Sequence, residues 1–212
     1  GFKGKIIGFV YDAMESGIYL DDIADEIYQM PYPSTGAESF LTRLNYIHSK
    51  SKIDVIIPTL DSEIPLYIRL HKELKALGIH TFICTEKQFN LRDKSKLFQY
   101  FTSKDVAVPK TVLLNSVAEI NKAIQDIEFP VFMQELMEGD EFNVVIVGDG
   151  KGNCLGMVPQ RKLVITDKGK GFGGVVVNNP ALEKFARKII QILSWRGPCE
   201  LEIIKDKEGA FH

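Results

Sequence analysis

The sequence is poor in the residues that build disulfide scaffolds and metal centres. Among its 212 residues there are three cysteines and four histidines. Cys84, Cys154 and Cys199 lie far apart and outside any CxxC spacing, and the histidines form no HExxH pair. An odd number of widely spaced cysteines argues against a disulfide framework and a structural zinc site. We therefore expect reduced thiols and a cytoplasmic location.

Long apolar runs and runs of positive charge are also missing. No apolar segment approaches the roughly 20 residues that a membrane-spanning helix needs. The net charge is −2 and no basic stretch stands out, which disfavours nucleic acid and anionic membranes as partners. No secretory signal is visible, although Gly1 is not an initiator residue. The remaining composition, 45% hydrophobic and 25% charged, is that of an ordinary globular protein.

The first part of the chain alternates apolar runs with amphipathic stretches. This pattern predicts strands joined by helices, and therefore right-handed crossovers and a parallel sheet. The expected strands are Lys5–Tyr11, Ile53–Ile57 and Ile79–Cys84, and the expected helices are Ser16–Tyr28, Ala37–Ser49 and Glu63–Leu77, with Gly78 as the C-cap.

Two carboxylates, Asp61 and Glu63, follow the second of these strands. Ligands of parallel sheets bind beyond the carboxyl ends of the strands, so both residues are candidates for a binding site. The plainer interpretation, which we favour, is negative charge at the N-terminus of the next helix, where the helix dipole stabilises it.

From about residue 90 onward the pattern changes to strands and turns. Asp93 is suited to cap a helix that begins at Lys94. The stretch from 167 to 174 is too glycine-rich to predict regular structure. Strands are expected at 111–115, 128–133, 142–147, 155–164 and 199–205, and further helices at 116–127 and from Pro180.

The stretch from Gln134 to Val147 carries the clearest polar motif. An acidic turn, Glu138–Glu141, precedes a predicted strand. Phe142, Val144 and Ile146 face one side of this strand, and Asn143, Val145 and Val147 face the other. Such a bend exposes backbone groups that a flat heterocycle can pair with, and the carboxylate after it can accept hydrogen bonds from sugar hydroxyls. On these residues alone, a solvated hairpin turn is the plainer interpretation.

Several segments occur in an order known from one family. They are IDVIIPTLDSE (53–63), LRDK (91–94), VPKT (108–111), FPVF (129–132), QELMEGDEF (134–142) and GPCELE (197–202). No segment is decisive alone, but together they resemble the ATP-grasp superfamily, most closely its members similar to the carbamoyl-phosphate synthase large subunit. The resemblance implies an α/β N-terminal (pre-ATP-grasp) domain with a parallel sheet over 1–90. It implies a two-lobed α+β ATP-grasp domain with an antiparallel sheet over 91–212, its lobes at about 91–133 and 134–212.

The resemblance also implies an activity. Enzymes of this family hold ATP between two lobes, with Mg²⁺ bridging the phosphates, and transfer the γ-phosphoryl group to a carboxylate. An amine then attacks the acyl phosphate and forms a C–N bond. Catalysis of this kind is mainly positioning and charge neutralisation. The expected enzyme is therefore an ATP- and Mg²⁺-dependent ligase acting on a small-molecule carboxylate and an amine.

Nucleotide-binding roles follow from the resemblance residue by residue. Lys94 matches a basic residue that contacts the ATP phosphates, and a lysine in the first turn of a helix is placed where an anion is favoured. Glu141 matches the carboxylate that binds the ribose hydroxyls. The hinge that pairs with adenine is matched by Glu135, Leu136 and Met137. The alternative for Lys94 is a solvated surface lysine.

Metal-binding and catalytic roles are implied in the same way. Glu202 matches the first Mg²⁺ ligand, since hard carboxylate oxygens suit this ion, and Glu200 is a weaker candidate on the same strand. The catalytic candidates are Arg161 and Lys162, which lie where related enzymes present basic residues to phosphate or substrate carboxylate. A solvated strand face for both glutamates, and plain surface charge for Arg161 and Lys162, remain open.

Three parts of the family pattern are missing from the sequence. They are the first strand of the N-terminal sheet, a phosphate-binding lysine with a glycine-rich lid loop after Phe132, and the E-x-N segment after His212. We expect them to exist in the full-length protein and to be omitted here. The alternatives are a degenerate, non-catalytic nucleotide-binding relative, and an unrelated α/β module that binds a sugar or nucleotide.

The sequence does not name the acid, the amine or the oligomeric state, for which a homodimer through the N-terminal sheet or helices is the working expectation. The whole interpretation depends on one geometric prediction. The Glu135–Glu141 bend, the Glu202 strand and Lys94 must line a shared cleft.

Overall fold

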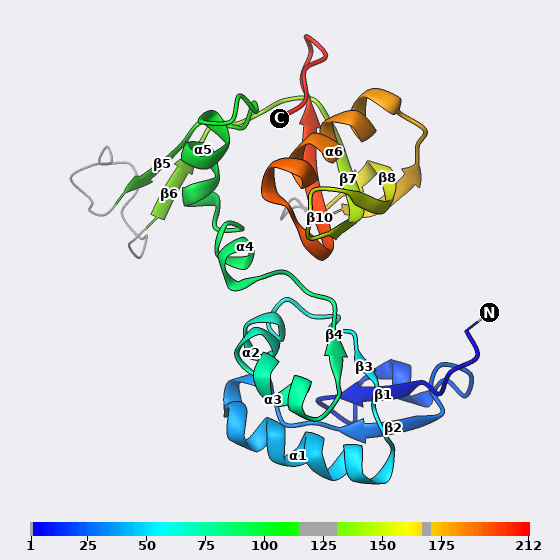
Figure 1. Ribbon diagram of the computed structural model, residues 1–212. Helices are drawn as coiled ribbons and strands as arrows, with labels where there is room; N and C mark the ends of the chain where they lie inside the picture. The colour runs from blue at the N-terminus through cyan, green and yellow to red at the C-terminus, as the bar shows by residue number, and fades with distance from the viewer. Residues whose placement is uncertain (1, 115–130, 167–170) are drawn as a thin grey trace, which may run out of the picture. The chain divides into compact units, whose positions relative to one another are not determined.

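The computed structural model describes residues 2–114, 131–166 and 171–212, so the predicted helix 116–127 lies outside the described residues. The chain divides into two compact units, Gly1–Thr81 and Phe82–His212, whose elements are labelled in Figure 1. In the described ranges, none of the helices combines the length and the apolar character of a membrane span.

The first unit contains two pairs of parallel strands. Strand β1 (Ile7–Val10) pairs with β2 (Glu26–Gln29), and β3 (Val55–Ile56) pairs with β4 (His80–Thr81). In the described residues the two pairs are not joined into the single parallel sheet that the sequence predicts. The helices of this unit are η1 (Ser16–Tyr19), η2 (Pro33–Thr35), α1 (Ala37–Lys50), α2 (Ile64–Arg69) and α3 (His71–Ala76).

Helix α1 forms where the sequence predicts it because its apolar residues recur on one face. Phe40, Leu44 and Ile47 are fully buried, at the spacing that lines one side of a helix. The Phe40 ring meets Tyr67 of α2 edge to face, with 5.5 Å between ring centroids. This contact fixes α2 against α1 and forms the centre of the first unit.

Two predicted helices of the first unit are wrong in part. Ser16–Tyr28 forms the short η1 and then strand β2, because apolar residues such as Tyr19 and Ile23 remain exposed and give a helix no face to bury. The predicted helix Glu63–Leu77 breaks at Leu70 into α2 and α3. Its predicted C-cap is confirmed: Gly78 has φ 76°, and the following Ile79 N–H donates to Leu74 C=O.

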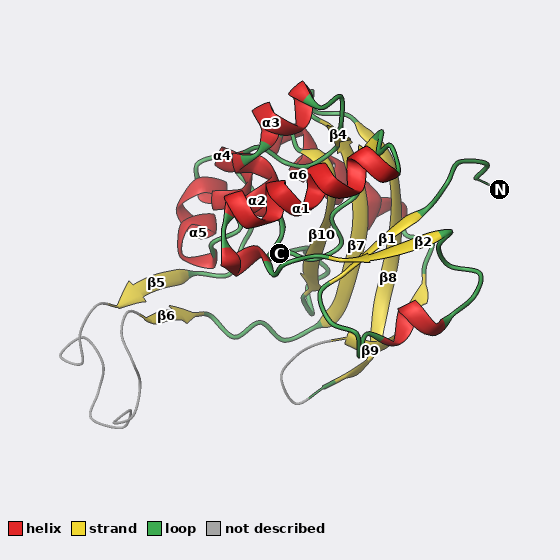
Figure 2. Cartoon of the chain, turned by 90° about the horizontal axis from the view of Figure 1, so that it is seen from below, coloured by secondary structure: helices red, strands yellow, loops and turns green. Residues whose placement is uncertain are grey.

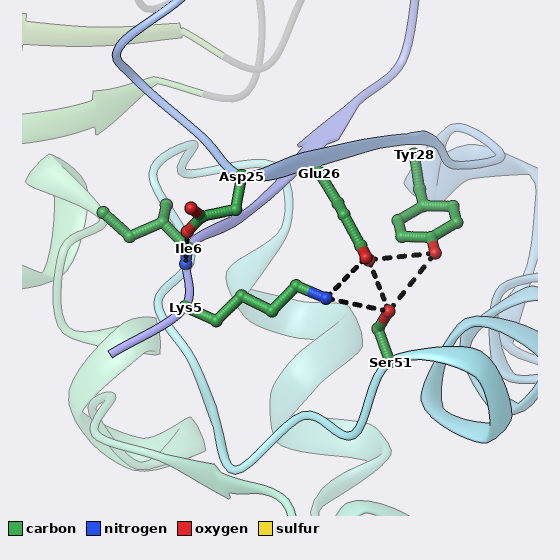
Figure 3. A network of polar contacts seen from close by, with 6 residues as sticks. All are labelled: Lys5, Ile6, Asp25, Glu26, Tyr28 and Ser51. Carbon is green, nitrogen blue, oxygen red and sulfur yellow. Dashed lines mark hydrogen bonds and ion pairs between the residues drawn. The ribbon is translucent and has the colours of Figure 1, made fainter. Parts of the chain in front are cut away.

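A polar network joins β1, β2 and α1 at the amino ends of the two strands (Figure 3). The Glu26 carboxylate accepts hydrogen bonds from Lys5, Tyr28 and Ser51, the residue that ends α1. The bonds from Lys5 and Ser51 lower the pKa of Glu26 to about 2, and Glu26 in turn raises the pKa of Lys5. Lys5 also donates to Ser51, so each member of the network has a partner.

The second unit is built around an antiparallel sheet with the strand order β10-β7-β8-β9 (Figure 2). Its strands are β7 (Asp140–Asp149), β8 (Cys154–Ile165), β9 (Gly171–Val176) and β10 (Arg196–Lys205). The unit also contains α4 (Glu86–Asn90), α5 (Lys94–Thr102), α6 (Pro180–Leu193) and the antiparallel pair of β5 (Thr111–Leu114) with β6 (Val131–Gln134).

The sheet has a helix face and an open face. Alternate residues of β7 (Phe142, Val144 and Ile146) are buried on the face that α6 covers, and α6 contributes Leu182 and Ile190 to this core. This face is the helix face. The residues between them, beginning with Glu141 and Asn143, point to the other side, which we call the open face.

Helix α5 is anchored to the helix face of the sheet. Phe101 and Val106, in and just after α5, form one apolar cluster with Ile189 of α6, against which Leu201 of β10 packs. Asp93 begins α5 as predicted, since its carboxylate accepts the Ser95 N–H at 3.0 Å. These contacts hold the first turn of α5 close to β10.

The residues from 82 to 90 belong to the second unit, whereas the sequence suggests a boundary after residue 90. The Gln88 side chain of α4 donates to the carbonyls of Leu193 and Ser194 at the end of α6. The Arg196 guanidinium donates to Ile83 C=O at 2.6 Å. Both contacts are within the second unit and tie this segment to it.

The prediction of irregular structure at 167–174 is wrong for 171–174, which form part of β9. Glycine is required here because two backbones approach closely. A Cβ atom at Gly174 would lie 2.8 Å from Arg161 C=O of the neighbouring strand. Residues 167–170 lie outside the described residues.

The three cysteines are free thiols, as predicted. Cys84 is buried, and Cys154 and Cys199 are partly buried. Burial raises the pKa of the Cys199 thiol to about 12, so this thiol stays protonated and is a poor nucleophile near neutral pH.

Candidate functional site

Four of the predicted site residues form one charged cluster, which we define as Lys94, Glu141, Lys162 and Glu202. Lys162 Nζ lies 3.2 Å from Glu141 Oε2 and 3.3 Å from Glu202 Oε1. Lys94 Nζ lies 4.0 Å from Glu202 Oε2. The Lys162 side chain is 6% exposed, and the other three are more open to solvent. The cluster therefore has a buried cation at its centre and accessible groups around it.

The register of the sheet explains why these residues meet. Glu202 of β10 and Gln160 of β8 both lie opposite Asn143 of β7. Glu141 and Lys162 are each two residues from this row, so they point to the same open face. Lys94 joins the cluster from the first turn of α5, which the apolar contacts with α6 hold in place.

A glycine brings the strand that carries Glu141 into position. A Cβ atom at Gly139 would lie 2.0 Å from Lys205 C=O, so no side chain fits between the turn and the end of β10. The acidic turn therefore brings the backbone at Gly139 close to the backbone of Lys205. It sets the point at which β7 begins to pair with β10.

The charges of the cluster suit an anion that carries several oxygens. Two ammonium groups converge on the single carboxylate of Glu202. Lys94 is in the first turn of a helix, where the dipole disfavours a cation unless an anion is near. A phosphate group can accept hydrogen bonds from both lysines at once.

Asn143 is a site residue that the sequence analysis does not identify. In the described part of the chain, its Oδ1 is the one buried side-chain polar atom without a hydrogen-bond partner. Such an atom is costly unless something binds to it. Alternation along the strand places Asn143 on the same face as Glu141, and this pattern could mark it as a candidate. That its Oδ1 lacks a partner among the described residues is visible only in the structure.

The oxygens of Glu202 and Asn143 fit Mg²⁺ bound together with phosphate. The two residues are direct cross-strand neighbours on the open face. Among the described residues there is no group of three or more histidines, cysteines or carboxylates that could hold a metal by itself. Mg²⁺ commonly binds through one or two carboxylates plus substrate phosphates, and this donor set meets that requirement.

A small pocket adjoins the cluster. It has a volume of about 150 Å³ and is lined by Asn143, Gln160, Arg161, Lys162 and the glycine-rich start of β9. A larger, open depression of about 880 Å³ runs along α1 and the end of β2 in the first unit. It contains none of the predicted site residues, so the chemistry points to the smaller pocket.

Arg161 is not part of the charged cluster. In the register it lies opposite Phe142, on the helix face, and its guanidinium is paired with Asp140 at 2.6 Å. Arg161 and Lys162 were predicted as a catalytic pair, but neighbouring residues on a strand point to opposite faces. The structure therefore separates them.

The predicted adenine hinge lies between β6 and β7. Glu135 N–H donates to Lys110 C=O at 2.8 Å, and the Glu135 carboxylate accepts the Lys110 N–H at 3.3 Å. The Leu136 side chain is 87% exposed, and Met137 follows it. In the described ranges, no hydrogen bond or ion pair joins Glu135–Met137 to the charged cluster.

Comparison with known proteins identifies the fold. No family model and no curated protein sequence matches the chain. Among solved structures, the L-amino acid ligase from Bacillus licheniformis superposes with a TM-score of 0.62 at 13% identity, over 89% of this chain and 54% of the ligase. The biotin carboxylase–βγ-ATP complex from Campylobacter jejuni has a TM-score of 0.66 at 15% identity, over 98% of this chain and 58% of the carboxylase.

A third similar structure is the N5-carboxyaminoimidazole ribonucleotide synthetase from Thermotoga maritima, with a TM-score of 0.55 at 16% identity over 89% of this chain and 55% of the synthetase. The chain thus spans about half the length of these three enzymes. The sequence resemblance is confirmed at the level of the fold: the mixed α/β fold of this chain, with its four-stranded antiparallel sheet, is similar to the folds of these three enzymes.

Proposed function

We propose that this chain carries the nucleotide site of an ATP- and Mg²⁺-dependent ligase that activates a carboxylate as an acyl phosphate for attack by an amine. The observation that supports this function most is the charged cluster. Two lysines and two carboxylates from four separate elements meet at one open face, in a fold shared with ligases. The substrates we propose are ATP, a small-molecule carboxylate and an amine.

The lysines of the cluster bind and orient phosphate in this proposal. Lys162 is held between Glu141 and Glu202 before ATP arrives, so little reorganisation is needed when a phosphate oxygen approaches. Lys94 adds a second donor from the first turn of α5. Donors that are positioned in advance stabilise the charge that develops during phosphoryl transfer. Lys162 thus takes the predicted catalytic role, without Arg161.

The carboxylates have separate tasks. Glu141 accepts hydrogen bonds from the ribose hydroxyls, and the backbone of Glu135–Met137 pairs with adenine. Glu202 and the Asn143 Oδ1, which has no partner among the described residues, would hold Mg²⁺. When bound, Mg²⁺ neutralises charge on the phosphates.

The experiment that tests this function measures ATP binding to the full-length protein by calorimetry, with Mg²⁺ and with EDTA. We expect affinity that depends on Mg²⁺ and falls in Lys162→Met, while Arg161→Met, a matched change on the other face of the same strand, binds as the wild type does. ATP affinity that is the same with Mg²⁺ and with EDTA, and the same in Lys162→Met as in the wild type, would contradict the proposal. Phosphate release with carboxylate and amine mixtures then separates a ligase from a protein that only binds nucleotide.

A further inference from the structure

Beside the charged cluster, the open face of the sheet becomes apolar. Three valines with 40%, 42% and 65% exposure, namely Val145, Val158 and Val176, make up what we call the valine patch. Val145 of β7 lies directly opposite Val158 of β8. Val176 of β9 lies opposite Gln160, which is two residues from Val158 on the same side of β8. The patch therefore spans three strands, with Val145 and Val158 directly opposite each other and Val176 diagonal to Val158.

Position along the strands links the patch to the charged cluster. Val145 is two residues beyond Asn143, and Val158 two residues before Gln160. With a rise of about 3.4 Å per residue, Val145 and Val158 lie about 7 Å along the strands from the polar row, and Val176 continues that row on β9. That separation matches the reach of a small molecule with a carboxylate at one end and a short hydrocarbon chain at the other.

The size of the patch argues against a protein as its occupant. A stable protein interface buries about 800 Å² on each partner, and three partly exposed valines supply far less. Small-molecule sites combine apolar contact surface with a few polar groups that fix the orientation of the ligand, and these valines lie beside such polar groups. The charged Glu200, opposite Val145, further limits the apolar area.

We propose that the carboxylate substrate of this ligase carries an aliphatic side chain, which the valine patch contacts while its carboxylate lies at the charged cluster. This inference rests on the proposed function, because it assumes that the open face binds the acid that ATP activates. Its new content is the substrate class: short, apolar and branched acids or amino acids, in preference to charged ones.

The first test compares ligands on the wild-type full-length protein in the presence of ADP and Mg²⁺. Thermal shift and calorimetry are measured with L-leucine and isovalerate, and with L-aspartate and succinate. We expect the aliphatic ligands to bind about 10-fold more tightly than the charged ones, since each methylene in an apolar site changes affinity by about 10-fold or more. Equal affinity would overturn the inference.

The second test uses a matched pair of variants. Val158→Thr keeps the size and the branching of the side chain but adds a hydroxyl to the patch. Val175→Thr makes the same change at a residue of similar exposure, 47%, which lies opposite Arg161 on the helix face. We expect Val158→Thr to weaken binding of L-leucine or isovalerate several-fold with ATP affinity unchanged, and Val175→Thr to change neither.

The outcomes separate this inference from the proposed function. If ATP binds with Mg²⁺ but Val158→Thr leaves the affinity for aliphatic ligands unchanged, the inference fails and the ligase proposal stands. If ATP does not bind, both fail. A change of oligomeric state by light scattering, or a ligand-free loss of stability greater in Val158→Thr than in Val175→Thr, would show that protein covers the patch, and would also overturn the inference.

Discussion

Two lysine–carboxylate networks in this protein are built from similar residues but differ in whether every polar group has a hydrogen-bond partner. Around Glu26 in the first unit, a lysine and two hydroxyls converge on one carboxylate, and each group has its partner. Around Lys162 in the second unit, a buried lysine bridges two carboxylates, one of which a second lysine also approaches. Beside it, within the part of the chain that the structure describes, Asn143 Oδ1 has no hydrogen-bond partner.

The difference separates a structural network from a binding site. The Glu26 network joins two strand starts to the end of a helix, and its bonds lower the pKa of the carboxylate to about 2. In the described residues each member of this network has a hydrogen-bond partner within it. The Lys162 cluster has excess donors on one carboxylate and a buried oxygen without a donor, which a bound phosphate and cation would complete. Four predictions test this contrast.

The largest effect is expected from Lys162→Met. The change removes the central cation and leaves Glu141 and Glu202 close together without compensation, so phosphate binding is lost together with its stabilisation during transfer. We expect phosphate release to fall by about 100-fold or more, as for the loss of one positioned donor in other active sites. A steady-state assay measures this, with Arg161→Met as the control; equal loss in both variants would refute the separation of the two faces.

Glu202→Gln should have the next largest effect. The amide keeps the shape of the side chain but loses the charge that favours Mg²⁺, so the concentration of Mg²⁺ needed for half-maximal ATP binding should rise by about 10-fold or more. Titration of Mg²⁺ at fixed ATP measures it. Glu200→Gln, on the same strand and face, serves as the control. An unchanged Mg²⁺ requirement in Glu202→Gln would remove this residue from the metal site.

Glu141→Gln should weaken ATP binding by about 10-fold, because a hydrogen bond to a charged group contributes about 1.5–3 kcal/mol. Calorimetry with ATP and with inorganic triphosphate, which lacks the ribose, isolates the cause. We expect the loss for ATP alone. The control is Glu138→Gln, whose carboxylate pairs with Lys207 at 2.7 Å outside the cluster. An equal loss for triphosphate would place Glu141 at the phosphates instead of the ribose.

The smallest effect is expected from Glu26→Gln, and it should appear in stability alone. The folded-state pKa of Glu26 is about 2, below the ordinary value of 4.5. Its contribution is therefore complete above pH 4.5 and is lost as the pH falls toward 2. Denaturant unfolding across this window should show a shallower acid dependence in the variant than in the wild type, with ATP affinity unchanged. A parallel acid dependence in both proteins would contradict the network.

Much of the fold could be predicted because segments with strong hydrophobic periodicity form the elements that this periodicity indicates. The apolar spacing in 37–49 and from Pro180 onward and the alternation in 142–147 each predict an element that the structure contains. The errors lie where a local pattern is weak: β2 was taken as part of a helix, and β9 as irregular. Their structure comes from pairing with a distant strand, which no local periodicity records.

The candidate site divides in the same way. The family resemblance picks out candidates for binding nucleotide, metal and substrate, and the structure brings four of them, Lys94, Glu141, Lys162 and Glu202, into one cluster. It does not join the predicted hinge residues Glu135–Met137 to this cluster by any hydrogen bond or ion pair among the described residues. The resemblance does not distinguish Arg161 from Lys162, which are adjacent in sequence and similar in charge. Only the pairing of β7 with β8 decides which of the two points to the open face.

By itself, the sequence determined the kinds of elements, the order of the motifs and the chemical groups available for nucleotide and metal, because these follow from local spacing and side-chain type. The tertiary structure alone decided which groups meet. Strand register sets the face of every side chain, and a shift of one residue would reverse it. Likewise, the surroundings of Asn143 Oδ1 and the grouping of the valines on the open face arise only when the four strands pair.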